Sequence, residues 1–214
     1  MSHAPPWAWA ALFLLGAYHG INPAMGWLFA VALGLQKQNG RAVWQALVPI
    51  AVGHVLAIAA VIFVAAMLGA ALPLPMLRVM VAVVLVSFGI YRLRRKKHSS
   101  FGGMQVGFRD LTIWSFLMAC GHGAGLMLLP VLLGMSGGGG EHAAHAVGFP
   151  NPAMQVLAVG VHTAGYLLLT GVIAWLVYTR LGVAVLRKAW VNLDIMWAVA
   201  LIATAGLTLL SAWF

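Results

Sequence analysis

The chain has 214 residues, of which 63% are hydrophobic and 7% are charged, and its mean hydropathy is +0.99. A water-soluble core cannot bury so large a share of apolar residues, so the composition excludes a soluble globular protein and indicates that lipid surrounds the chain. The formal net charge of +9 does not indicate nucleic-acid binding, because the cationic residues cluster between apolar segments.

Six apolar segments follow one another along the chain, and each is close to or above the length of about 20 residues that crosses a bilayer. They cover residues 7–35, 43–71, 75–92, 110–135, 153–178 and 189–213. The sequence therefore predicts an all-α polytopic membrane protein with six transmembrane helices. The opening MSHAPPW has no basic stretch, so we expect the first span to be a retained helix and not a cleaved signal.

The cationic residues predict which side of the membrane each connection faces. Eleven of the twelve Lys and Arg residues lie between spans 1 and 2, 3 and 4, or 5 and 6: Lys37, Arg41, Arg92, Arg94, Arg95, Lys96, Lys97, Arg109, Arg180, Arg187 and Lys188. These three connections share one side of a six-span protein, and cationic connections face the cytoplasm. The pattern predicts a multi-pass protein of a bacterial cytoplasmic membrane with both termini outside.

The second half of the chain is similar to the first. Residues 15–35 (LGAYHGINPAMGWLFAVALGL) align with residues 118–135 (MACGHGAGLMLLPVLLGM), and both segments carry His-Gly followed by a proline. A second alignment pairs His54 with His162. The sequence thus predicts an internal repeat.

We expect one integral membrane domain built from two three-helix repeats, residues 1–98 and 99–214. Because each repeat has an odd number of spans, the second crosses the membrane upside down relative to the first. Transporters use this inverted design, with the substrate site at the midplane between the repeats.

Four histidines lie deep within four different spans: His19, His54, His122 and His162. At about 1.5 Å of rise per residue, each lies roughly 15–18 Å inside its apolar segment. Buried histidines also serve as hydrogen-bonded packing residues between helices. Four at one depth favour the alternative, contact with a ligand or a proton.

The residues around these histidines favour a late first-row transition metal, namely nickel, cobalt, zinc or copper. Imidazole prefers such cations, and no carboxylate lies at this depth. Pro23 lacks an amide proton, so we expect it to free the carbonyl of His19, while Asn22 offers an amide oxygen. Met118 and Cys120 offer sulfur. Histidines also carry protons near neutral pH, so proton movement is an equal candidate.

Four further features also have assignments. Asp194 aligns with Arg78 and is a candidate for gating at the cytoplasmic mouth, and Tyr18 is a candidate for proton coupling. Arg78 is expected to extend toward the outer surface. His142 and His145, in the glycine-rich connection 136–145, either collect metal outside the membrane or belong to a solvated linker.

The His-Gly-x-x-Pro element in HGINPAMGWLFAVALG, with its counterpart in the second half, resembles the lysine-exporter superfamily in its broad sense. This superfamily includes nickel and cobalt permeases and the urease and hydrogenase accessory permeases. The nickel and cobalt permeases are most similar, because a histidine and a short polar motif mark their first span. Asn22 and Pro23 stand here where those proteins carry an acidic pair. The resemblance implies a polytopic fold and metal transport.

Other functions remain open or are disfavoured. A membrane thiol relay needs two cysteines, and Cys120 is the sole cysteine. A haem protein ligated by paired histidines is an alternative, as is an exporter of a small organic solute or amino acid with Asn22, Tyr18 and Trp27 in its pocket. We expect no enzymatic activity, no organic cofactor and no nucleic-acid partner. The expected partners are the lipid bilayer and a small cation, and a homo-oligomer is left open.

Overall fold

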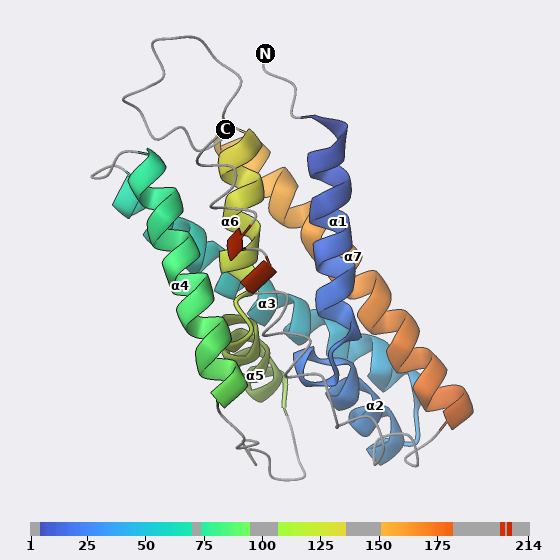
Figure 1. Ribbon diagram of the computed structural model, residues 1–214. Helices are drawn as coiled ribbons and strands as arrows, with labels where there is room; N and C mark the ends of the chain where they lie inside the picture. The colour runs from blue at the N-terminus through green and yellow to red at the C-terminus, as the bar shows by residue number, and fades with distance from the viewer. Residues whose placement is uncertain are drawn as a thin grey trace.

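The computed structural model describes residues 5–69, 74–94, 107–135, 151–181, 202–203 and 205–206. Within these residues every regular element is a helix, which confirms the prediction of an all-α chain for this part of the protein (Figure 1). The elements are α1 (Pro6–Ile21), the 3-10 turn η1 (Pro23–Met25), α2 (Trp27–Gln36), α3 (Gly40–Gly69), α4 (Leu74–Arg94), α5 (Phe108–Gly121), α6 (Ala124–Met135), α7 (Pro152–Leu176) and the π turn η3 (Val177–Leu181).

Two helices in the described part of the chain are long and apolar enough to cross a membrane. They cover Gly40–Leu68 and Pro152–Arg180, each 29 residues long. The bent pair α5 and α6 counts as a third if it is one span. These helices indicate a membrane protein. The full set of six spans stays a prediction, because most of 189–213 lies outside the described residues.

The first apolar segment is divided into two helices by a break, residues 22–26, called here the first break. α1 ends before Pro23, because a proline inside a helix removes a hydrogen bond and clashes with the preceding turn. The Asn22 side chain then accepts a hydrogen bond from the backbone N–H of Ala24 at 2.9 Å. Gly26 has φ of 147°, a conformation that requires glycine. The chain therefore turns here and restarts as α2.

A second break separates α5 from α6 at residues 122 and 123. The two helices meet at an angle of 60°, and Gly123 has φ of 70°. Pro130 lies inside α6, which continues through it. The bend in this span is thus set by the glycine that follows His122 and not by the proline.

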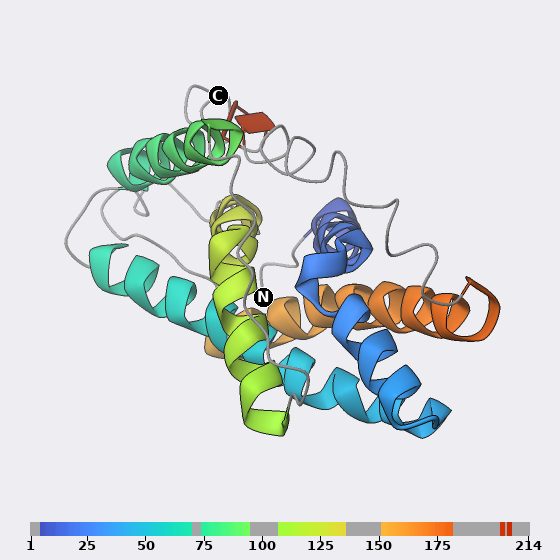
Figure 2. The same ribbon diagram turned by 90° about the horizontal axis from the view of Figure 1, so that it is seen from below.

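Close helix pairs hold the bundle together, α1 against α7 and α5 against α3 (Figures 1 and 2). Glycines allow the backbones to touch. A Cβ atom on Gly16 would lie 1.9 Å from the carbonyl oxygen of His162, and one on Gly53 would lie 2.2 Å from that of Thr112. Such contacts are the main way in which helices associate within lipid, where burial of apolar surface gives little driving force.

One end of the bundle carries nearly all of the described cationic residues. The C-terminal ends of α2, α4 and α7 and the N-terminal ends of α3 and α5 all lie at the bottom of Figure 1. The Lys and Arg residues at or beside these ends are Lys37, Arg41, Arg92, Arg94, Arg109 and Arg180. Arg78 lies near the opposite end of α4. We call the bottom end the cationic end.

The contact between α1 and α7 gives a matched pair of glycine variants. We expect Gly165→Ala to destabilise the protein by about 1–3 kcal/mol, because its Cβ would lie 2.3 Å from the carbonyl oxygen of Phe13. Gly160→Ala on the same helix should be neutral or slightly stabilising, since no atom lies within 4 Å of that Cβ. Unfolding of the two variants in detergent, followed by tryptophan fluorescence, measures the difference. Equal stabilities would contradict the close contact.

Candidate functional site

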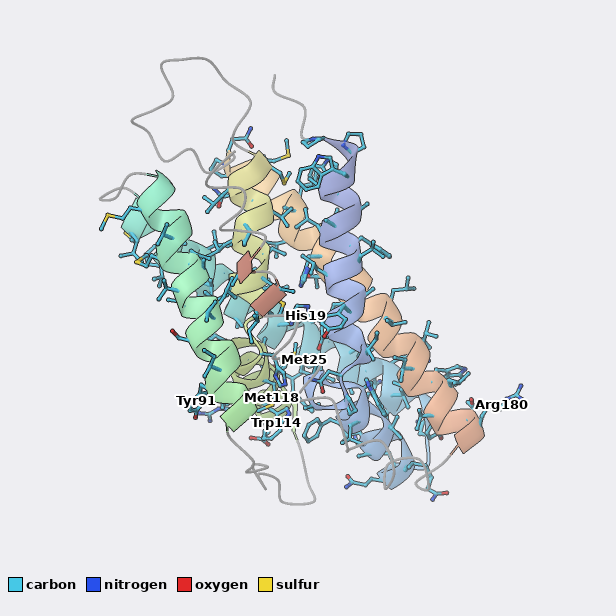
Figure 3. The ribbon with its side chains drawn as sticks, in the orientation of Figure 1. His19, Met25, Tyr91, Trp114, Met118 and Arg180 are labelled. Atoms are coloured by element: carbon cyan, nitrogen blue, oxygen red, sulfur yellow. The ribbon has the colours of Figure 1, made fainter. Side chains whose placement is uncertain are left out.

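Three buried imidazole rings meet at the centre of the bundle. His19 comes from α1, His54 from α3 and His162 from α7, and the side chain of each is fully buried. The ring centroids are 5.2 Å apart for His19 and His162, 5.5 Å for His54 and His162, and 5.9 Å for His19 and His54. Figure 3 shows His19 near the middle of the bundle, on the lower part of α1. We call these three residues the histidine triangle.

Hydrogen bonds to backbone carbonyls orient two rings of the triangle. Nδ1 of His19 lies 2.6 Å from the carbonyl oxygen of Leu15, and Nδ1 of His162 lies 3.2 Å from that of Leu12. A carbonyl only accepts, so Nδ1 must be the nitrogen that carries the proton. In the neutral ring the lone pair is then on Nε2. In histidines that bind metals through one ring nitrogen, a backbone carbonyl commonly holds the other ring nitrogen in this way.

His54 is the member of the triangle with the most unusual surroundings. Both of its ring nitrogens are buried without a hydrogen-bond partner in the described part of the chain, and so is Nε2 of His162. Leaving such a group unsatisfied costs about 1–3 kcal/mol. The ring of His54 stacks on Tyr166, with centroids 4.0 Å apart and an interplanar angle of 17°. Buried nitrogens without partners are the feature that points to a bound ion or proton.

The fourth histidine, His122, lies at the break between α5 and α6. It is buried, and its Nδ1 lies 2.7 Å from the carbonyl oxygen of Met118, four residues earlier. His19 makes the same bond to Leu15, so the two aligned histidines share a local conformation. That His122 shares one layer and one site with the triangle stays a prediction.

Two oxygen ligands expected from the sequence have structural partners instead. The side-chain oxygen of Asn22 caps the 3-10 turn through the N–H of Ala24. The carbonyl of His19 accepts the N–H of Asn22 at 3.4 Å, so Pro23 does not leave it bare. The reason is that the chain turns at the first break instead of continuing as a kinked helix.

The remaining predicted residues are placed as follows. Cys120 is exposed on α5, and its place among the ligands stays a prediction. Met118 is half-buried, and its backbone carbonyl holds His122. Tyr18 is half-buried, with its ring 6.3 Å from that of His19 and nearly perpendicular to it. Asp194 and the connection 136–145 lie outside the described residues.

The triangle does not form a finished metal site. Among the residues that the structure describes, no group of three or more His, Cys, Asp or Glu side chains is arranged to hold a metal ion. The rings of His54 and His162 are parallel to within 4° and stacked. A nitrogen lone pair lies in the plane of its ring, so stacked parallel rings do not direct their lone pairs at one point. Ring rotation is needed before all three can bind one ion.

Sequence reasoning missed Tyr166, which is fully buried against His54. The available signal was its position one helical turn after His162, on the same face of the helix. It also missed Ser115, whose hydroxyl donates to the carbonyl of Ile50 at 2.7 Å and joins α5 to α3. No sequence signal identifies that bond, since its partner is a backbone atom.

No protein-family model matches the chain, and no curated protein or solved structure is significantly similar to it.

The role of Asn22 can be tested with two substitutions. We expect Asn22→Ala to lower the free energy of unfolding by about 0.5–2 kcal/mol, because the cap of the 3-10 turn is lost. Asn22→Ser should retain most of the stability, because serine also caps helix starts. The measurement is denaturant unfolding in detergent. If both variants unfold like the parent, Asn22 is not acting as a cap.

Proposed function

We propose that this protein is a membrane transporter that moves a small cation through the histidine triangle. The observation that supports this proposal is the meeting of three fully buried imidazoles from three different helices, two of them with ring nitrogens that lack a hydrogen-bond partner in the described residues. Polar groups at this depth are costly, and ion and proton pathways are where membrane proteins retain them.

The chemistry of the three side chains favours a late first-row metal ion as the substrate. Imidazole suits nickel, cobalt, zinc and copper. Three imidazoles that bind one such ion through Nε2 at about 2.0–2.1 Å have ring centroids about 5–5.5 Å apart. The separations here are 5.2–5.9 Å. The helices therefore already stand at nearly the required spacing, and the main change needed is rotation of the His54 ring.

Protons are the natural coupling ion. A histidine that binds a metal ion must be neutral, so metal entry displaces any proton on the ring. Within the described residues, the rings of Tyr18 and Tyr166 also contact the triangle. Phenols ordinarily ionise only near about pH 10, so the histidines carry the exchange. In this proposal Tyr18 lies beside the site and takes no charge.

Three observations support the inverted repeat that underlies this proposal. The spans with His19 and His122 both break shortly after these residues, and both rings bond to the carbonyl four residues earlier. α1 lies along α7, and their aligned counterparts α5 and α3 also lie side by side. We place the cationic end in the cytoplasm of a bacterial cell, with both termini outside. The resemblance to nickel and cobalt permeases agrees with this assignment.

Metal binding by histidine variants tests the proposal. We expect His19→Ala, His54→Ala and His162→Ala each to weaken binding of Ni²⁺, Co²⁺, Zn²⁺ or Cu²⁺ by about 10–100-fold or more, because each removes one ligand. Tyr178→Phe, at a half-buried residue beyond α7, is the control and should bind like the parent. Equilibrium dialysis of the purified protein measures binding, and uptake into proteoliposomes measures transport.

One result would contradict the metal assignment. If the parent and the three triangle variants bind every metal equally, the triangle is not a metal site. His122→Ala decides separately whether the fourth predicted histidine belongs to the site, because a loss of affinity as large as that of the triangle variants would add it to the ligands.

The pH dependence of binding is a second test. Neutral imidazoles bind metal and protonated ones do not, so we expect affinity to fall as pH falls, with up to three protons displaced per ion. Replacement of His54 by alanine should reduce the slope of log affinity against pH by up to one. Dialysis at a series of pH values provides the slopes. An affinity that is independent of pH across the range in which histidine titrates would exclude a histidine site.

A further inference from the structure

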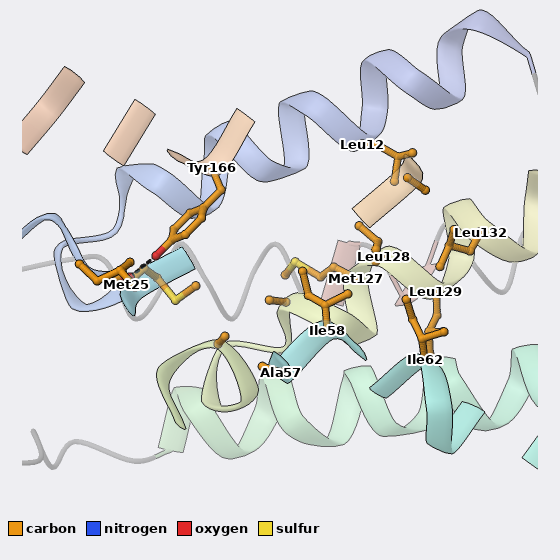
Figure 4. Close-up of a cluster of buried hydrophobic side chains, with 14 of the residues drawn as sticks. Leu12, Met25, Ala57, Ile58, Ile62, Met127, Leu128, Leu129, Leu132 and Tyr166 are labelled. Carbon is orange, nitrogen blue, oxygen red and sulfur yellow. Dashed lines mark hydrogen bonds between the residues drawn. The ribbon is translucent and has the colours of Figure 1, made fainter. Parts of the chain in front are cut away.

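Tyr166 connects the histidine triangle with the first break. Its side chain is fully buried, and its ring stacks on that of His54 with centroids 4.0 Å apart. Its hydroxyl donates a hydrogen bond to the backbone carbonyl of Met25, within the 3-10 turn of the break (Figure 4). One side chain thus touches both the candidate ligand and the irregular segment that follows His19.

The first break is built closely around this hydroxyl. Met25 is 1% exposed, so its carbonyl oxygen has little access to solvent. A Cβ atom on Gly26 would lie 3.2 Å from the tyrosine oxygen and 2.7 Å from Cγ2 of Ile50. Glycine is required there both by its φ of 147° and by this space. The break is therefore shaped to receive the Tyr166 hydroxyl.

The two sides of the triangle are closed in different ways. Toward the cationic end, the Tyr166–Met25 hydrogen bond spans from α7 to the first break. Toward the opposite end, buried apolar side chains from α1, α3 and α6 fill the space between the helices (Figure 4). These residues are Leu12, Ile58, Ile62, Met127, Leu128, Leu129 and Leu132.

The two sides also differ in the residue that lies one helical turn after a histidine. Ile58 follows His54 by one helical turn, as Tyr166 follows His162, so the first repeat has an apolar residue where the second has a tyrosine. Buried apolar side chains, among them Trp27 and Val31, lie on the cationic side as well. The hydrogen bond of Tyr166 is the contact that joins a ring stacked on the triangle to the first break.

We propose that Tyr166 is a positioning residue that closes the cationic side of the histidine triangle, through its bond to the first break, while its ring orients His54. This inference rests on the proposed transport function. Rotation of the His54 ring, which ion binding requires, moves the surface against which Tyr166 stacks. Ion binding is then coupled to loss of the hydrogen bond between the Tyr166 hydroxyl and the Met25 carbonyl. When this bond breaks, the path toward the cytoplasm opens at residues 22–26.

Thiol labelling of the purified full chain in nanodiscs tests this role without any ion. In a Cys120→Ser background, which removes the sole cysteine, two reporters stand on either side of His19: Ala24→Cys in the first break and Ala11→Cys in α1. Both alanines are half-buried. We expect Tyr166→Phe to raise the rate of labelling by a small water-soluble reagent about 5–10-fold at the Ala24→Cys reporter, as expected for loss of one buried hydrogen bond. The rate at the Ala11→Cys reporter should stay unchanged.

Three comparisons distinguish a positioning role from general destabilisation. Tyr178→Phe, a half-buried tyrosine beyond α7, should change neither rate. Gly26→Ala places a Cβ atom beside the Tyr166 hydroxyl and should displace it from Met25. This variant should therefore also raise the labelling rate at the Ala24→Cys reporter and leave the rate at the Ala11→Cys reporter unchanged. Tyr166→Phe should bind Zn²⁺ more tightly than the parent, because the phenyl ring still stacks on His54 and the hydrogen bond that ion binding must break is gone, whereas Tyr166→Leu should bind it more weakly than Tyr166→Phe.

Equal increases at both reporters, or none at the Ala24→Cys reporter, would overturn the proposal. Neither result depends on metal binding, so the triangle variants still decide the transport function by themselves. Loss of Zn²⁺ binding in those variants together with unchanged labelling in Tyr166→Phe would leave the transporter in place and remove Tyr166 from its mechanism.

Discussion

Backbone polar groups in the middle of a bilayer must find partners within the protein, and this constraint shapes the centre of the molecule. The first break interrupts a helix at residues that are mostly buried, where water has little access to replace the lost hydrogen bonds. Three side chains therefore form hydrogen bonds with backbone groups at or beside the break. They are the amide of Asn22, the indole of Trp27, which donates to the carbonyl of Ile21 at 2.9 Å, and the hydroxyl of Tyr166. The sequence at the break is thus determined largely by the need to satisfy its own backbone.

The same constraint explains the orientation of the histidines. His19 and His162 each hold Nδ1 against a backbone carbonyl. The bond from His162 runs between helices and reaches the carbonyl of Leu12 because glycines let α1 and α7 touch. Close packing through glycine therefore serves the chemistry of the site as well as the stability of the bundle.

The sequence predicted the all-α fold of the described residues, because hydropathy acts locally. The depth of the histidines follows from counting along a helix and stays a prediction. The sequence could not predict the direction in which each side chain points around its helix, because that depends on the neighbouring helix. For this reason Tyr166 was overlooked. The role of Asn22 as a cap depends on a turn that propensity alone does not define.

The length of the two principal spans has a mechanical consequence. A helix of 29 residues is about 43 Å long, whereas the hydrocarbon core of a bilayer is about 30 Å thick. Helices that exceed the core tilt to keep their apolar surface in lipid, and the amount of tilt follows the local thickness. α3 carries His54 and the span that includes α7 carries His162, so a change in bilayer thickness acts on the crossing angle of the two helices that hold the stacked rings. The lipid composition of the membrane, through its thickness, therefore affects the geometry of the histidine triangle.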